Sequence, residues 1–159
     1  MPRRMQILSA GSIASAPVPV AIVASRFNEA IVDRLIAGAA DALQRHGIPE
    51  SSLRVVRCPG AWELPLAARA LAKAGSVRAI VALGCVVRGE TAHFEHVAGP
   101  CCAGLAAIQS EFLIPVANGV LTVNDWDQAE ARAGGKAGNK GAEAALAALE
   151  MLNLLERLR

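Results

Sequence analysis

Aromatic residues are scarce in this sequence, and tyrosine is absent. Three phenylalanines and two tryptophans make up 3% of the 159 residues, so the chain offers no aromatic platform on which nucleic-acid bases could stack. Basic runs are also lacking, because 16 lysines and arginines are scattered among 14 acidic residues to give a net charge of +2. Both absences argue against a nucleic-acid-binding protein.

The chain has no apolar run long enough for a membrane span. Its longest apolar stretches, such as 79–87, have the length of a buried strand. The first 16 residues carry two arginines but no compact apolar core followed by a cleavage site, so we expect residues 1–17 to be a flexible segment and not a signal peptide. The protein is therefore expected to have no membrane partner.

Cysteine pairs of the C-x-x-C type are also missing. The four cysteines are Cys58, Cys85, Cys101 and Cys102, and this usage favours small buried side chains in the reducing cytoplasm. His93 and His96 lie close to the adjacent cysteines, but the spacing matches no familiar zinc motif. No metal site is expected, and the lack of a G-x-S-x-G sequence argues against a serine hydrolase.

Apolar residues are abundant instead, at 53%, whereas charged residues make up only 19%. This composition excludes a disordered chain, and the length fits one domain. A single chain this apolar would expose more hydrophobic surface than usual. We therefore expect part of that surface to be buried between subunits.

Apolar spacing predicts four strands and five helices that alternate along the chain. The strands are expected at 18–24, 53–58, 77–87 and 114–123, and the helices at 29–46, 62–74, 92–112, 125–133 and from 139 or 141 to 158. Ser25 or Asn28 can cap the first helix, and Pro100 is expected to start, kink or interrupt the third. Gly119 indicates a bulge or a close backbone approach in the fourth strand.

This order predicts a small α/β sandwich. Strands that are apolar on both faces and alternate with helices form a parallel sheet covered on both sides. Ligands bind beyond the carboxyl ends of the strands in such sheets. The predicted site therefore combines residues 25–28, 58–63 and 86–93 with the segment after the fourth strand.

The residues at these strand ends allow two interpretations each. Phe27 is either a loop anchor or a stacking surface for a planar ligand, and Glu63 either serves the dipole of a helix or accepts a hydrogen bond from a ligand hydroxyl. The stretch from Gly89 to Thr91 can bind a phosphate at a helix start, although it lacks the glycine spacing of a P-loop. His93 is either a helix-start residue or a proton-transfer group.

A cationic stretch follows the fourth strand. Arg132, Lys136 and Lys140 form either a solvated face or a structured loop held by the glycines between them. From the residues alone, the chain is a small α/β domain with a polar site suited to phosphate, such as a phosphosugar-binding module. No reaction follows from them.

The same segments resemble the 6,7-dimethyl-8-ribityllumazine synthase family of riboflavin biosynthesis. The matching segments are Ser25-Arg-Phe-Asn28, Pro59-Gly-Ala-Trp-Glu-Leu-Pro65, Ala82-Leu-Gly-Cys-Val-Val-Arg-Gly-Glu-Thr-Ala-His-Phe94, Gly119-Val-Leu-Thr122 and Lys136-Ala-Gly-Asn-Lys-Gly141. They occur in the family's order and spacing. The resemblance implies a flavodoxin-like three-layer sandwich over residues 18–159, with a four-stranded parallel sheet.

The resemblance also implies a reaction without cofactor or metal. A transferase of this family condenses 5-amino-6-(D-ribitylamino)uracil with 3,4-dihydroxy-2-butanone 4-phosphate to give the lumazine, phosphate and water. The residues implied to bind the ribitylaminouracil are Phe27, Ala61, Trp62, Glu63, Cys85, Val86, Val87 and Asn118. Those implied for the butanone phosphate are Glu90, Thr91 and Arg132, with His93 as the proton-transfer residue and Asn28, Lys136 and Lys140 in support.

Two positions depart from the family's pattern. Many relatives carry an aromatic residue at the position of Asn118, where a neighbouring subunit closes the pocket. With Asn118 we expect one side of that ring sandwich to be lost and the affinity for the ligand to change, and an edge hydrogen bond from Asn118 is the alternative. Trp62 is bulkier than the phenylalanine common at its position. Neither change touches the residues implied for phosphate binding or proton transfer.

The family assembles as homopentamers, and some members form decamers or icosahedral 60-subunit shells. The short connection from Gly134 to Gly141 resembles that of shell-forming members. Riboflavin synthase is the implied pathway partner. Two alternatives to an enzyme are a non-catalytic flavin- or lumazine-binding member and a shell protein selected for assembly alone. Asn118 supports the binding protein, but such a member would be expected to lose His93 or Arg132, and both are present. The surviving site residues also argue against the shell protein.

Overall fold

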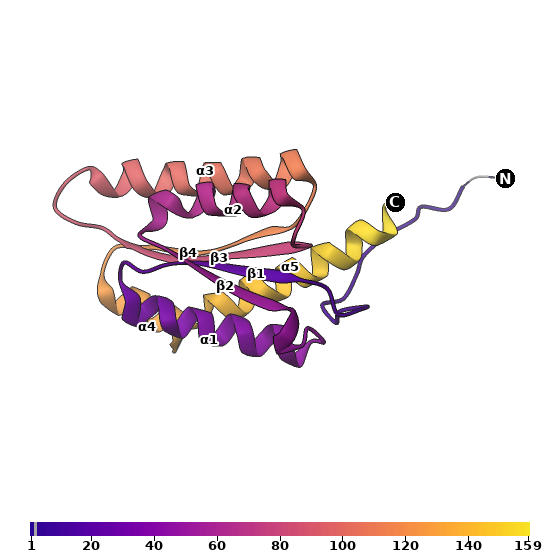
Figure 1. Cartoon of the computed structure of the whole chain (residues 1–159), viewed down its shortest axis with the longest axis horizontal. Coiled ribbons are helices and arrows are strands. Elements are labelled where there is room, and N and C mark those ends of the chain that lie inside the picture. Colours follow the sequence, from indigo (N-terminus) through magenta and orange to yellow (C-terminus); the bar gives the residue numbers. More distant parts are fainter. Residues whose placement is uncertain (2) are drawn as a thin grey trace.

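A four-stranded parallel sheet lies at the centre of the computed structural model, which describes Met1 and residues 3–159 (Figure 1). The strands are β1 (Val20–Ser25), β2 (Leu53–Cys58), β3 (Ala79–Val87) and β4 (Val116–Val123), in the order β2-β1-β3-β4. All neighbouring pairs are parallel. Every strand therefore ends at the same edge of the sheet, which confirms the predicted sheet.

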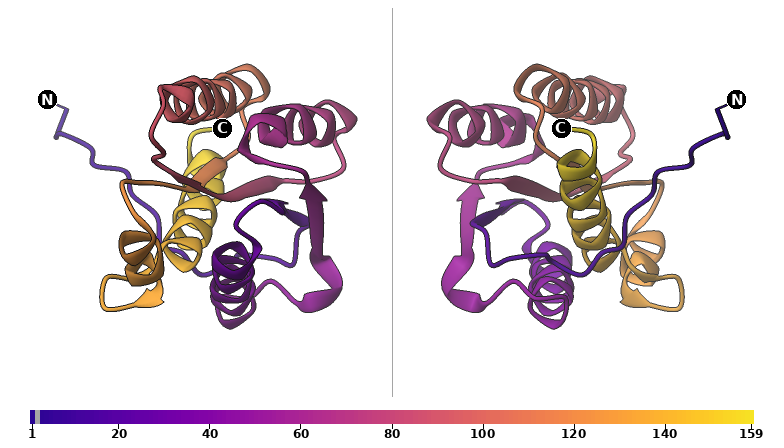
Figure 2. Two further views of the ribbon diagram at one scale, coloured as in Figure 1. Left: turned by 90° about the vertical axis from the view of Figure 1, so that its left-hand side faces the viewer. Right: turned by 90° about the vertical axis from the view of Figure 1, so that its right-hand side faces the viewer.

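Helices cover both faces of this sheet and give three layers. The α-helices are α1 (Glu29–Arg45), α2 (Leu64–Ala74), α3 (His93–Phe112), α4 (Trp126–Arg132) and α5 (Lys140–Arg157). Figure 2 shows α2 and α3 on one side of the sheet and α1, α4 and α5 on the other. This arrangement confirms the predicted α/β class and the flavodoxin-like sandwich.

Four short elements were not predicted from the sequence. Two 3₁₀ turns, η1 (Glu50–Ser52) and η2 (Ala61–Glu63), precede β2 and α2. A small antiparallel hairpin of β5 (Ala133–Gly135) and β6 (Gly138–Asn139) connects α4 to α5. Elements of two or three residues are too short to show an apolar period, so pattern reasoning does not detect them.

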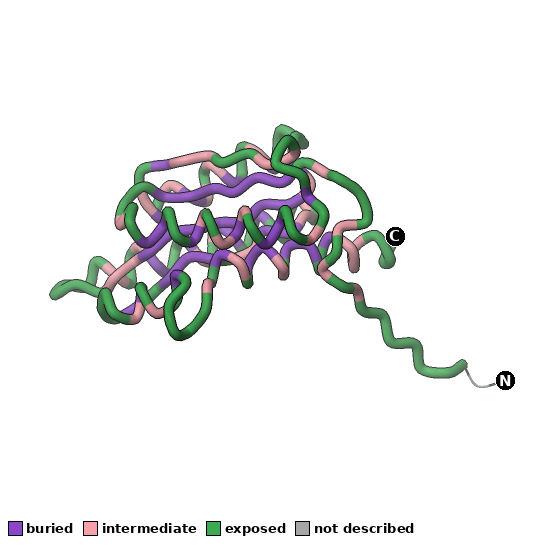
Figure 3. The backbone as a smooth tube through the Cα atoms, turned by 90° about the horizontal axis from the view of Figure 1, so that it is seen from below, coloured by how far each residue is buried: buried purple, intermediate pink, exposed green. Residues whose placement is uncertain are grey.

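The core consists of two apolar clusters, one on each face of the sheet. Alternate residues of β1 enter different clusters: Val20 and Ile22 pack against α1 and α5, whereas Ala21 and Val23 pack against α2 and α3. Figure 3 shows the buried backbone concentrated in the central strands. The edge strands are only partly buried, contrary to the expectation of strands covered on both faces, because β2 and β4 each have a neighbour on one side only.

Two helix boundaries differ from expectation. Helix α3 runs from His93 to Phe112 with Pro100 inside it, so Pro100 neither starts nor interrupts the helix. Ser25 ends β1, and Asn28 occupies the N-cap position of α1 without a capping side-chain hydrogen bond. The cap of α5 is regular, since the Asn139 side chain accepts a hydrogen bond from the Ala142 amide at 3.1 Å.

Gly119 marks a close backbone approach, as expected. A Cβ atom at this position would lie 3.0 Å from the Ala82 carbonyl oxygen and 3.2 Å from the Cβ of Ala144. A side chain here would therefore press β4 away from β3 and α5.

Part of the N-terminal segment lies along α5. The Asn153 side-chain amide donates to the carbonyl oxygens of Gly11 and Ile13, at 2.8 and 2.7 Å. The Ala14 amide donates to the His46 carbonyl oxygen at 2.7 Å. The flexibility expected for residues 1–17 stays a prediction, and residue 2 lies outside the described residues.

Candidate functional site

A cavity of about 340 Å³ opens at the carboxyl ends of β1, β2 and β3. Three of the four predicted segments line it. The lining residues are Phe27, Asn28, Gly60, Ala61, Trp62, Cys85, Val86, Val87, Gly89, Thr91, His93, Phe94 and Val97. The cavity therefore lies at the edge of the sheet that the strand-end rule predicts.

The turn between β1 and α1 presents an aromatic ring to this cavity. The Phe27 side chain is 71% exposed, and the Phe27 amide donates to the Pro59 carbonyl oxygen at 3.0 Å. Asn28 has left-handed backbone angles (φ 60°, ψ 45°), and its side-chain amide donates to the Cys85 carbonyl oxygen at 2.8 Å. Asn28 thus joins the turn to β3, which is why it does not cap α1.

The turn between β2 and α2 brings a second aromatic side chain and a carboxylate. Trp62 lines the cavity and is 60% exposed. Glu63 is half-buried and lies beside the lining residues; one of its oxygens accepts a hydrogen bond from the Gly60 amide at 3.0 Å. The Glu63 carboxylate therefore stabilises this turn and keeps lone pairs for a ligand.

Two buried cysteines lie close to these turns: Cys85 lines the cavity, whereas Cys58 belongs to the core cluster beneath α2 and α3. Burial raises the pKa of the Cys85 thiol to about 11. The pKa of Cys58 is also raised, first by burial and then by the nearby charge of Glu63. Both side chains are therefore neutral, weakly polar groups at physiological pH.

The loop from β3 to α3 contributes the candidate proton-transfer residue. His93 is the first residue of α3; it is exposed and lines the cavity, and its amide donates to the Thr91 hydroxyl oxygen at 3.3 Å. Free amides of the first helical turn add partial positive charge at this end of α3, which favours an anion such as phosphate. Glu90 is exposed but does not line the cavity.

Arg88 also holds this loop, although sequence reasoning gave it no role. Its guanidinium lies 4.3 Å from the centroid of the Phe94 ring, forms an ion pair with Glu95 and donates through Nε to the Asn124 side-chain oxygen at 3.2 Å. The hydrogen bond from Arg88 lowers the pKa of the Glu95 carboxyl. Only its position between Val87 and Gly89, within the matched motif, could have pointed to it.

Other predicted residues lie elsewhere on the chain. Arg132 and Lys140 line a second cavity of about 250 Å³ beside the end of β4, and the Arg132 guanidinium donates to the Gln128 carbonyl oxygen at 3.1 Å. Lys136 lies in a separate surface depression next to Asp127 and Glu130. Within one chain, Arg132 does not join Thr91 in a single phosphate site.

Asn118 is also remote from the first cavity. It lies on β4, paired with Ala82, and is exposed. Its side-chain amide lies 3.5 Å from the Cys102 sulfur, and its oxygen accepts from the Val120 amide at 3.0 Å. The candidate site of one chain therefore contains the residues expected around the uracil ring and the proton-transfer residue, but neither Asn118 nor Arg132.

Among Met1 and residues 3–159, no group of three or more His, Cys, Asp or Glu side chains is placed to hold a metal ion. None of the helices in this part of the chain is long and apolar enough to cross a membrane.

Comparison with known proteins gives a consistent result. The family model described as 6,7-dimethyl-8-ribityllumazine synthase matches residues 17–156. Curated proteins named 6,7-dimethyl-8-ribityllumazine synthase are 58% identical in Stenotrophomonas maltophilia (strain K279a), over 87% of this chain and 89% of that protein, and 53% identical in Xylella fastidiosa (strain M12), over 93% and 96%. Together with the parallel sandwich and the cavity at its strand ends, these matches show that the chain belongs to the 6,7-dimethyl-8-ribityllumazine synthase family.

Proposed function

We propose that this chain is the transferase that condenses 5-amino-6-(D-ribitylamino)uracil with 3,4-dihydroxy-2-butanone 4-phosphate. The products are 6,7-dimethyl-8-ribityllumazine, inorganic phosphate and water, in the penultimate step of riboflavin biosynthesis. Family membership supports this reaction. The observation on this chain that best supports the reaction is the cavity at three strand ends, which is lined by Phe27, Trp62, Thr91 and His93.

The uracil substrate fits the wall formed by the first two turns. The exposed ring of Phe27 stacks on the pyrimidine, and backbone groups of Cys85, Val86 and Val87 face its edge. The ribityl chain extends past Ala61 and Trp62, where the Glu63 carboxylate accepts hydrogen bonds from its hydroxyls. Asn28 supports this arrangement through its bond to Cys85.

The phosphate substrate needs positive charge and hydrogen-bond donors. The first turn of α3, the Thr91 hydroxyl and a guanidinium group supply them, and Arg132 is the arginine that we assign to this role. Glu90 contacts the same substrate, and Lys136 and Lys140 add to the local positive charge.

The chemistry requires little from the protein beyond orientation and proton transfer. The uracil supplies the amine and the butanone supplies the carbonyl, so the cavity brings the two reacting atoms together. Imine formation releases water, elimination releases phosphate, and ring closure releases a second water. Each step moves a proton, and His93 is within the cavity to assist.

A complete site needs a second copy of the chain, in our proposal. Arg132 and Asn118 are exposed and lie outside the first cavity of their own chain, so a neighbouring chain in a homopentamer can present them to it. Exposed apolar side chains such as Leu113 and Trp126 supply surface for such contacts. Decamers or icosahedral 60-subunit shells would extend the same assembly.

The pathway and its compartment follow from the same proposal. The lumazine product is the substrate of riboflavin synthase, which we propose as the partner in the pathway. The cytoplasm is the compartment that we propose, supported by four free cysteines, three of them buried.

Turnover tests this proposal directly. Purified protein is mixed with both substrates while the fluorescent lumazine and the released phosphate are followed. Arg132→Ala is expected to lower kcat/KM for the butanone phosphate by roughly 10- to 100-fold, the effect of losing a charged hydrogen bond. His93→Ala is expected to lower kcat about 100-fold without abolishing it, because orientation remains.

Matched variants control for surface changes. Arg45→Ala removes an exposed arginine at the far end of α1, and His96→Ala removes an exposed histidine of α3 that does not line the cavity; both are expected to keep full activity. A folded wild-type protein that binds lumazine but makes no product would contradict the proposal and favour a binding protein. A completely inactive His93→Ala protein that still binds substrate would contradict the orienting mechanism.

A further inference from the structure

The position of the Phe27 ring depends on the backbone of its turn. The side chain is 71% exposed, so packing around the ring does not hold it in place. The turn Arg26–Asn28 connects Ser25, the last residue of β1, to Glu29, the first residue of α1. The position of the ring therefore depends on the two ends of the turn and on the hydrogen bonds of the turn itself to Cys58, Pro59 and Cys85.

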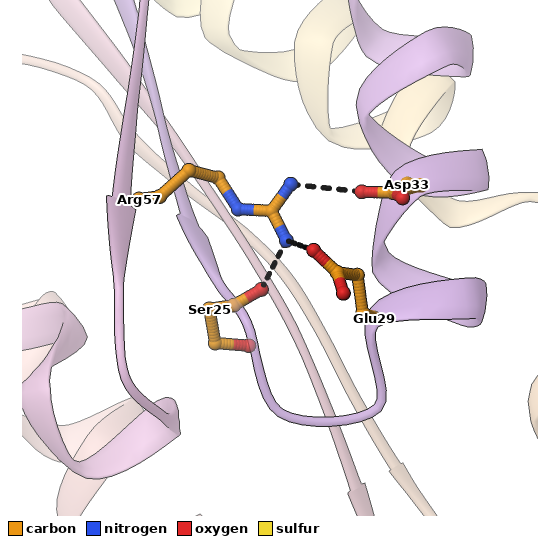
Figure 4. Close-up of polar contacts among 4 residues, drawn as sticks. All are labelled: Ser25, Glu29, Asp33 and Arg57. Carbon is orange, nitrogen blue, oxygen red and sulfur yellow. Dashed lines mark hydrogen bonds and ion pairs between the residues drawn. The ribbon is translucent and has the colours of Figure 1, made fainter.

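Arg57 on the neighbouring strand contacts both ends of this turn (Figure 4). Its Nη2 atom donates to the carbonyl oxygen of Ser25 at 3.3 Å and lies 3.6 Å from a carboxylate oxygen of Glu29. Its Nη1 atom donates to the Asp33 carboxylate at 2.8 Å. Ser25 is the last residue of β1, Glu29 is the first residue of α1, and Asp33 follows one turn later.

The sheet register accounts for this geometry. Arg57 is paired with Ala24, one residue before the end of β1. Strand alternation points Arg57 toward α1, on the face where Leu53 also packs, while Cys58 points to the opposite face. The guanidinium therefore spans from β2 to both ends of the turn.

Partial burial and a forked shape strengthen this contact. The Arg57 side chain is 27% exposed, so water and salt screen its charge less than that of a fully exposed arginine. An isolated surface ion pair contributes little to the free energy of folding. One planar guanidinium that contacts three acceptors, however, holds them in a fixed geometry. A lysine has a single charged nitrogen and cannot span the same acceptors.

We propose that Arg57 is a positioning residue for Phe27. By holding the turn that carries the Phe27 ring, Arg57 sets the affinity of the enzyme for the pyrimidine ring. This inference rests on the proposed function only in naming the ring that Phe27 stacks on. Arg57 itself does not line the cavity. It acts through the backbone of the turn.

Steady-state kinetics of Arg57→Met and Arg57→Lys test the role. Arg57→Met keeps an unbranched apolar side chain but removes the guanidinium group. Arg57→Lys keeps the positive charge but not the planar guanidinium geometry. Arg57→Met is expected to raise KM for the ribitylaminouracil roughly tenfold, as for loss of a charged hydrogen bond, while KM for the butanone phosphate and kcat at saturation change less than about twofold. Arg57→Lys is expected to be intermediate.

Hydrogen exchange supplies a readout that needs no substrate. The amides of Arg26 and Phe27 donate to the carbonyl oxygens of Cys58 and Pro59, at 2.8 and 3.0 Å. Exchange at these amides is expected to be faster in Arg57→Met. The matched control is Arg69→Met, because Arg69 joins α2 to α3 through Glu111 and does not line the cavity.

The outcomes separate the two proposals. If wild-type protein makes no lumazine, the proposed function fails, and the exchange rates still decide the role of Arg57. If both KM values rise equally, if exchange in the turn is unchanged, or if Arg69→Met has the same effects, the positioning role is wrong. A melting temperature for each variant shows whether it is folded.

Discussion

At the scale of single residues, burial keeps two thiols of the core, those of Cys85 and Cys101, protonated. The pKa of Cys101 rises to about 12, chiefly through burial and also through the neighbouring Cys102 and Cys58, and that of Cys85 rises to about 11. Both side chains are nearly inaccessible to solvent. They act as small apolar groups in the core and not as nucleophiles.

These thiols predict a loss of stability in alkaline solution. The pKa of such a thiol in the unfolded chain is near 9.0, so above this pH the unfolded state releases protons that folded Cys85 and Cys101 keep up to about pH 11 and 12. Each thiol therefore contributes its full share to the free energy of unfolding below pH 9. As the pH rises further, this contribution falls by about 1.4 kcal/mol per pH unit for each thiol. Urea titrations from pH 8 to 11 measure it.

A variant isolates the contribution of one thiol. Cys101→Ala is expected to show a shallower pH dependence than wild-type protein over this range. Ile108→Val shortens another buried side chain of the same cluster and is expected to lower stability equally at every pH. Equal slopes in all three proteins would show that ionisation of Cys101 does not contribute.

At the scale of elements, α5 depends on a glycine at its second residue. A Cβ atom on Gly141 would overlap the Leu35 carbonyl oxygen of α1 and would lie 3.0 Å from the Asn139 side-chain oxygen that caps α5. Gly141 therefore lies where α5 packs most closely against α1 and also next to the side chain that caps α5.

Gly141→Ala is expected to destabilise the protein by about 1–3 kcal/mol, because α5 must shift away from α1. Gly11→Ala in the exposed N-terminal segment is the matched control: nothing lies within 4 Å of its added methyl group, so it is expected to change stability by less than about 0.5 kcal/mol. Chemical denaturation of both variants measures the two changes. A loss of stability in Gly141→Ala alone supports the crowding at Gly141, and a neutral Gly141→Ala would contradict it.

At the scale of the whole molecule, His93 and Arg132 lie in different cavities of one chain. Mixed complexes of two variants therefore test whether the site is shared between chains. If the site lies between neighbouring chains, a complex that contains both His93→Ala and Arg132→Ala chains has some interfaces with both residues intact. Random assembly makes about a quarter of the sites complete. Co-expressed variants are therefore expected to regain activity that neither variant has alone.

Native mass spectrometry of the same sample counts the chains in the complex. A mass of five chains, or a multiple of it, is expected. A monomer with full activity, or mixed complexes that show no regain, would contradict a site shared between chains.

The sequence by itself determined the class of fold and the edge of the sheet at which the site lies. Apolar spacing is a local property, so the four strands and five helices were predicted within a few residues of their observed bounds. Their alternation predicted a parallel sheet, and the strand-end rule selected Phe27, Trp62, Thr91 and His93. The family resemblance, confirmed by the comparisons, then named the chemistry.

Only the tertiary structure decided which residues share a cavity and which residues hold it in shape. The contacts of Arg57 with Ser25 and of Asn28 with Cys85 depend on the register between strands that are far apart in the sequence. Local propensity assigned Asn28 to a helix cap because nothing near it in the chain competes for its side chain. The carbonyl group that does compete comes from β3, and only folding brings it within reach.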